Sequence, residues 1–107
     1  GAAQVTQHHR PAPLFELGAI VSTPGASQAL APWQFRRYLD RHQMGDWGNV
    51  CEDDKALNDL AVKDGSRILS AYPINPDLPC KGFGENCVWV ITEADRSVTT
   101  FLLPEEY

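Results

Sequence analysis

Hydrophobic and polar positions follow two different periods along this chain, and each period predicts one type of secondary structure. In some segments apolar residues alternate with polar or small ones, and the segment at 87–92 is apolar on both faces, as in a central strand. In other segments apolar residues recur every three or four positions, which indicates helices. The strands are expected at residues 14–21, 67–72, 87–92 and 98–103. The helices are expected at residues 24–30, 33–43 and 52–64.

The residues at the helix starts support these limits. Pro24 follows Ser22 and Thr23, which can cap the first helix, and a proline at the first helical position loses no hydrogen bond. Three acids open the third helix, where they suit the positive end of the helix dipole. The expected apolar face of the second helix consists of Phe35, Tyr38, Leu39 and His42. The expected apolar stripe of the third helix consists of Ala56, Leu57, Leu60 and Ala61.

The predicted order of elements is β-α-α-α-β-β-β. This order indicates an α+β fold, with the helices packed on one face of an antiparallel sheet. Residues 1–13 are small, polar and broken by prolines, so we expect a flexible tail followed by a single domain over residues 14–107. The adjacent His8 and His9 in this tail would form a poor chelate, and no metal or cofactor is expected.

The net charge of −5 is unevenly distributed. Residues 1–50 carry four basic and three acidic side chains, for +1, whereas residues 51–107 carry five basic and eleven acidic ones, for −6. An acidic chain argues against nonspecific nucleic-acid binding. The longest apolar run has five residues, far below the roughly 20 that span a membrane, and no signal-peptide pattern opens the chain. We therefore expect a cytoplasmic protein without a membrane segment.

The three cysteines do not form a paired framework, and reduced thiols are the expectation in the cytoplasm. Cys80 and Cys87 bracket a loop with two glycines. A disulfide between them in an oxidising compartment is the alternative, worth about 2–3 kcal/mol. A nucleophilic pair of Cys51 with His42 has no support beyond the presence of both residue types.

A turn between the last two predicted strands holds Glu93, Asp95 and Arg96. Two carboxylates and a guanidinium at a strand end can position a phosphate or take part in acid–base chemistry. The alternative is a solvated hairpin, in which Asp95 caps the turn and Arg96 pairs with Glu93, worth under about 1 kcal/mol.

A second candidate is the glycine-bracketed loop that contains Asp46 and Trp47. A tryptophan in such a loop is either a plug in the core or an exposed anchor for a partner, and both readings stay open. The predicted second helix offers a third candidate, because Arg36, Arg37 and Arg41 lie off its apolar face with Trp33 nearby. This strip can contact nucleic acid or an acidic partner, or it is simply a solvated face.

Seven exact strings belong together as one pattern: FELG (15–18), TPGA (23–26), RH (41–42), GDWG (45–48), GSRILSAY (65–72), WVITEADRSVTT (89–100) and LPEEY (103–107). This pattern resembles a family of small, uncharacterised bacterial proteins carried on plasmids and other mobile elements. The resemblance covers residues 14–107, and its most specific part is the last stretch. It departs between Cys80 and Cys87, where this chain is longer than the family's usual hairpin. The resemblance implies a mobile-element setting in a bacterial cytoplasm and no established activity.

The predicted architecture is also similar to RelE- and barnase-like ribonuclease folds. In such a fold Glu93 would be the base, and Arg67 and Arg96 would stabilise the phosphate.

Three functions therefore stand as hypotheses. The first is an accessory protein that binds a protein partner, with Asp46, Trp47, Glu93, Asp95 and Arg96 as candidate binding residues. The second is a ribonuclease, and the third is a DNA-binding regulator that uses the basic helix.

Overall fold

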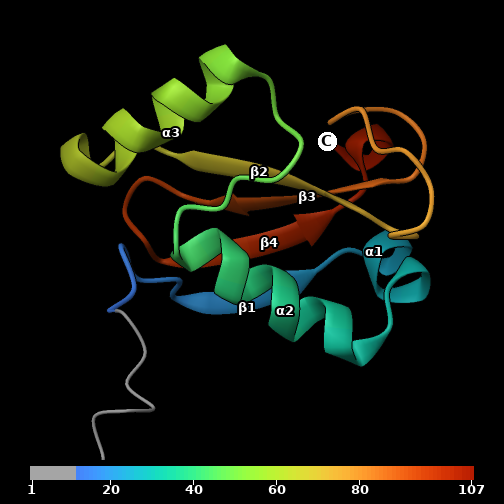
Figure 1. The fold of residues 1–107 in the computed structure, drawn as a ribbon. Coiled ribbons are helices and arrows are strands. Elements are labelled where there is room, and N and C mark those ends of the chain that lie inside the picture. Colours follow the sequence, from blue (N-terminus) through green and yellow to red (C-terminus); the bar gives the residue numbers. More distant parts are fainter. Residues whose placement is uncertain (1–11) are drawn as a thin grey trace, which may run out of the picture.

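The computed structural model describes residues 12–107, so the first eleven residues of the predicted tail, including His8 and His9, lie outside the described residues. The elements follow one another in the predicted order (Figure 1). They are β1 (Ala19–Ser22), α1 (Pro24–Ala29), α2 (Pro32–Gln43), α3 (Glu52–Asp64), β2 (Ile68–Pro73), β3 (Cys87–Thr92), β4 (Val98–Leu102) and the 3-10 helix η2 (Pro104–Glu106).

The four strands form one mixed sheet in the order β1-β4-β3-β2. The pairs β2–β3 and β3–β4 are antiparallel, as predicted, with Val90 opposite both Ser70 and Phe101. The predicted antiparallel sheet is thus confirmed for three of the four strands, and β1 is the exception, since it runs parallel to β4 with Ile20 opposite Thr99. Three helices and two strands separate β1 from β4, and such a long connection allows a parallel pair.

The first strand is shorter than predicted because the chain bends at Gly18. This glycine has a φ of +66°, and a Cβ placed on it would collide with the backbone of Ser97. The bend turns the preceding Phe15 into the core, where it packs with Trp47 and Ile68. Residues 14–18 therefore lie outside the sheet, and β1 begins at Ala19.

The helices α1 and α2 cover one face of the sheet (Figure 1). Tyr38 of α2 stacks on Tyr72 of β2 with ring centroids 4.5 Å apart, and Phe35 meets Phe101 of β4 edge-on at 4.8 Å. The predicted apolar face of α2 is confirmed, since Tyr38 and His42 are buried there.

The third helix lies beside β2, along the outer edge of the sheet (Figure 1). The Asn58 side chain donates to the Leu69 carbonyl at 2.8 Å and accepts from the Leu69 amide at 3.2 Å, so it pairs with β2 as a neighbouring strand would. The predicted apolar stripe of α3 is wrong in part. Ala61 is buried, but Leu57 and Leu60 are 62% and 58% exposed.

Candidate functional site

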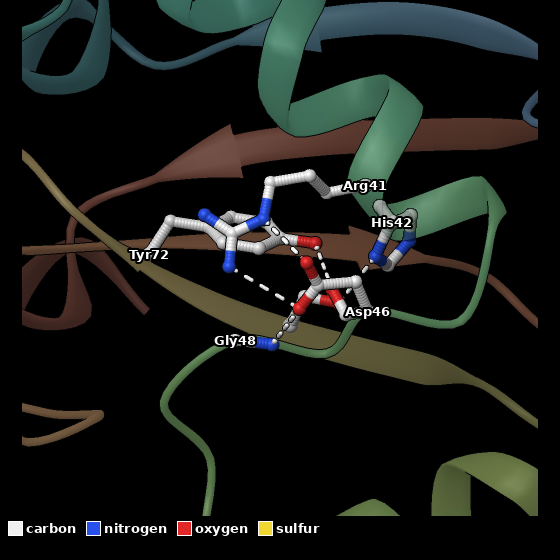
Figure 2. Close-up of polar contacts among 6 residues, drawn as sticks. Arg41, His42, Asp46, Gly48 and Tyr72 are labelled. Carbon is white, nitrogen blue, oxygen red and sulfur yellow. Dashed lines mark hydrogen bonds and ion pairs between the residues drawn. The ribbon is translucent and has the colours of Figure 1, made fainter.

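The loop after α2 is held by a charged pair that lies half-exposed on two tyrosine rings. Arg41 donates to Asp46 through Nε at 2.7 Å and Nη2 at 3.2 Å, which is a bidentate geometry. The guanidinium lies over the Tyr72 ring, 4.6 Å from its centroid (Figure 2). It is 5.7 Å from the centroid of the Tyr38 ring. The hydrogen bonds from Arg41 lower the pKa of Asp46, and the same contact raises the pKa of Arg41. Both groups therefore remain charged and paired at neutral pH.

The same loop packs its backbone against the sheet. Gly48 has a φ of +74° and forms a parallel bridge with Ala71, whose carbonyl oxygen leaves no room for a Cβ. The Gly48 amide donates to the Asp46 carboxylate at 3.2 Å. Trp47 is 4% exposed, and its Nε1 donates to Asp59 at 3.0 Å. Trp47 is thus a core residue and does not form an exposed anchor.

A chain of buried hydrogen bonds runs from Ser70 through His42 to Thr92 and Thr99. His42 Nδ1 lies 2.6 Å from the Ser70 hydroxyl, and Nε2 lies 2.9 Å from the Thr92 hydroxyl. The Thr99 hydroxyl is 2.7 Å from Thr92 and donates onward to the Leu17 carbonyl at 2.8 Å.

The Leu17 carbonyl fixes the direction of this chain because it can only accept. Thr99 donates to it, Thr92 donates to Thr99, and His42 must then donate through Nε2, leaving Nδ1 to accept from Ser70. Burial, with a smaller contribution from the nearby Arg96 charge, lowers the pKa of His42 to about 3. His42 is fully buried and neutral, and Ser70 and Thr92 engage both of its ring nitrogens, so it is not placed to activate Cys51 or to act on a surface substrate.

The charged side chains of Asp95 and Arg96, in the turn after β3, form hydrogen bonds with backbone groups. Arg96 has a φ of +59°, and its guanidinium donates to three carbonyls, those of Ala61 at 2.9 Å, Ser66 at 2.7 Å and Glu93 at 3.2 Å. It also lies 5.5 Å from the Phe15 ring centroid. A cation at these carbonyls suits the negative end of α3. Arg96 therefore links this turn to the end of that helix.

The candidate binding residue Asp95 and the other two residues of the proposed ribonuclease site, Arg67 and Glu93, have separate surroundings. Asp95 accepts from both the amide and the hydroxyl of Ser97, and these bonds lower the pKa of Asp95. Arg67 donates to the Tyr107 hydroxyl at 2.6 Å, with the guanidinium 5.4 Å from that ring. Within residues 12–107, the hydrogen bond that Arg96 donates to Glu93 goes to the backbone carbonyl and not to the carboxylate. The two arginines are committed to different partners and do not converge with Glu93.

The described residues contain no group of three or more histidine, cysteine or acidic side chains placed to hold a metal ion. Within the same residues, 12–107, no helix has the length and hydrophobicity needed to span a membrane.

The surface feature that the sequence did not resolve is the outward face of α2. Trp33 is 55% exposed, and Arg36 and Arg37, three and four residues further along the helix, are also exposed. We call these three residues the α2 strip. Residues at these spacings are neighbours on a helix surface. Helical spacing already places these residues off the predicted apolar face of the helix, but it leaves open whether they form a contact surface or a solvated face.

Comparisons of this chain with protein-family models, with curated proteins and with solved structures give no match.

Proposed function

We propose that this protein is a non-enzymatic accessory protein that binds an acidic protein partner through the α2 strip. The observation that carries the proposal is the exposed Trp33 beside two exposed arginines. Tryptophan and arginine are the residues most enriched at the energetic centres of protein interfaces. A tryptophan that leaves more than half of its surface in water gains stability by entering a partner's pocket.

The helix that carries this strip is rigidly anchored on its other face. Gln34 donates to the Ile74 carbonyl at 2.7 Å, and Tyr38 donates to the Pro73 carbonyl at 2.7 Å. Gln34 also accepts from the Ala31 amide at 2.8 Å, which closes the first turn of α2. These bonds hold the start of the helix in place, so little backbone order would have to be acquired on binding.

The charge pattern favours a protein over a nucleic acid. Arg36 and Arg37 are exposed, whereas Arg41 is engaged by Asp46 and two tyrosine rings. Two available cations on a chain of net charge −5 would neutralise few phosphates. They are sufficient to orient an acidic surface around one tryptophan anchor. The setting in this proposal is the bacterial cytoplasm and a mobile element, as the resemblance in sequence implies.

Affinity capture from a bacterial host with matched variants tests this proposal. Trp33→Ala should weaken retention of the specific partner more than about 30-fold, which is typical of loss of an interface hot spot. Arg37→Glu should also weaken it, and raised salt should weaken the unmodified protein's binding. The matched control is Leu57→Ala, which truncates an equally exposed apolar side chain on α3 and should leave retention unchanged.

Equal recovery of the partner by the unmodified protein and by Trp33→Ala would refute the proposal. Recovery of nucleic acid in place of a protein would favour the DNA-binding alternative on the same helix.

A further inference from the structure

The two edges of the sheet differ in whether the outward-facing backbone groups of the edge strand have hydrogen-bond partners. At the outer edge of β2, the Ala71 amide donates to the Trp47 carbonyl at 3.1 Å, and the Ala71 carbonyl accepts from the Asn49 amide at 2.7 Å. Asn58 satisfies both backbone groups of Leu69 on the same edge. The covered edge therefore has no free position for another strand from Leu69 to Ala71.

The other edge, at β1, is open in the part of the chain that the structure describes. The Ala19 amide donates to the Ser97 carbonyl and the Thr23 amide to the Phe101 carbonyl, both at 3.0 Å. Alternate residues of a strand face the same neighbour, so Ala19, Val21 and Thr23 direct their peptide groups at β4. Ile20 and Ser22 direct theirs away from it, and within residues 12–107 those amides and carbonyls make no hydrogen bond.

This edge is short, with four residues, but within residues 12–107 it lacks the other features that usually prevent strand addition. None of the four residues of β1 is charged, none is a proline, and Ile20 and Val21 are each 44% exposed. Natural edge strands are commonly protected by a lysine, a proline, a bulge or a covering segment. An uncharged, apolar edge of this kind is a template for a further strand.

We propose that β1 is the contact through which two copies of this chain associate, paired antiparallel about a two-fold axis at Val21. In that register Ile20 lies opposite Ser22 of the other copy, and these two residues can exchange amide-to-carbonyl hydrogen bonds in both directions. The free peptide groups are placed symmetrically around Val21, so one register satisfies all of them in both copies. Val21 then meets Val21 of the other copy on the same face of a continuous sheet.

The charge distribution permits a second copy at β1. Each chain has a net charge of −5, yet β1 is flanked by Gly18 and Thr23 and brings no charged side chain to the strand pairing. The nearest acid in the C-terminal turn, Glu106, is held by the Thr23 hydroxyl at 2.5 Å and the Gly25 amide at 3.1 Å. A two-fold contact is also the commonest symmetry of soluble oligomers.

Sedimentation over a concentration series tests this proposal on the full chain. The unmodified protein should move from 11.9 kDa at low concentration to twice that mass at high concentration. Ile20→Pro removes only an outward amide, so it should keep the fold and remain at 11.9 kDa throughout. The matched Val21→Pro variant removes an amide that faces β4 and should lose stability instead. A monomer at every concentration of the unmodified protein, or a dimer of folded Ile20→Pro, overturns the proposal.

A charge-pair experiment at Val21 is decisive if Ile20→Pro does not fold. Val21→Lys and Val21→Glu should each be monomeric, because like charges meet on the axis, and an equimolar mixture should recover the dimer. Failure of the mixture to associate overturns the proposed register. The result is independent of the proposed function, since Trp33→Ala should leave the dimer intact.

Discussion

Mild acid should destabilise this protein through His42. The imidazole is fully buried and neutral, and burial lowers its pKa from 6.5 to about 3. In the unfolded chain the same group takes up a proton as the pH falls below 6.5. The unfolded state therefore binds more protons between these two pKa values, and the free energy of unfolding falls as the pH falls through that window.

The magnitude follows from the two pKa values of His42. Between pH 7.5 and 5.0 the unfolded imidazole becomes almost fully protonated and the folded one does not, which costs about 2 kcal/mol of stability. Asp46, Asp95 and Glu106 also have lowered pKa values in the folded protein. Their stabilising effect is present above their unfolded pKa values and is lost mainly below pH 5. The window above pH 5 thus isolates the histidine.

Denaturant unfolding at a series of pH values measures this effect. The unmodified protein should lose about 2 kcal/mol from pH 7.5 to 5.0, whereas His42→Gln should start less stable and change little over the same range. A variant with His8 and His9 replaced by alanine leaves a single histidine for NMR titration and should unfold like the unmodified protein. Nitrogen chemical shifts should show the Nε2–H tautomer. A flat stability profile, or an imidazole that titrates near pH 6.5 in the folded state, would refute this account.

Three further outcomes can be measured, two of them on substituted proteins and the third on the unmodified protein. Arg96→Ala should cost about 2–4 kcal/mol in denaturant unfolding, and Arg96→Lys should recover only part of this because an ammonium cannot reach all three carbonyls. Gly48→Ala should cost more than about 2 kcal/mol, whereas Gly65→Ala, also at positive φ but facing open space, should cost about 1 kcal/mol. In timed alkylation followed by mass spectrometry, the exposed Cys51 should react first and Cys87 last, because burial raises the pKa of the Cys87 thiol to about 12.

The positions of the helices and strands could be predicted from the sequence because the residue patterns that determine them are local. The face of α2 that carries Tyr38 and His42 follows from helical spacing, and the antiparallel strands β2, β3 and β4 were found at nearly their observed limits. The parallel direction of β1 could not be predicted from the sequence. It depends on which strand the returning chain pairs with, and no local pattern of four residues contains that information.

The error at α3 has a specific cause. Periodicity assigns leucines to the buried face, but Asn58 can satisfy both free peptide groups of Leu69 and a leucine cannot. Burying an unpaired edge peptide is costly, so the helix turns its asparagine inward and leaves Leu57 and Leu60 in water.

The sequence points to these candidate site residues because charged and aromatic side chains in tight turns are typical of catalytic and binding sites. In this protein those turns are sharp, and their backbone groups need partners that regular structure does not provide. Arg96 supplies three carbonyls with donors, and Asp46 and Asp95 accept from amides in their own turns. Each of these side chains is already engaged within the fold. Trp33 differs because more than half of its surface is exposed to solvent. The outward face of α2 is therefore the better candidate for a partner-binding surface.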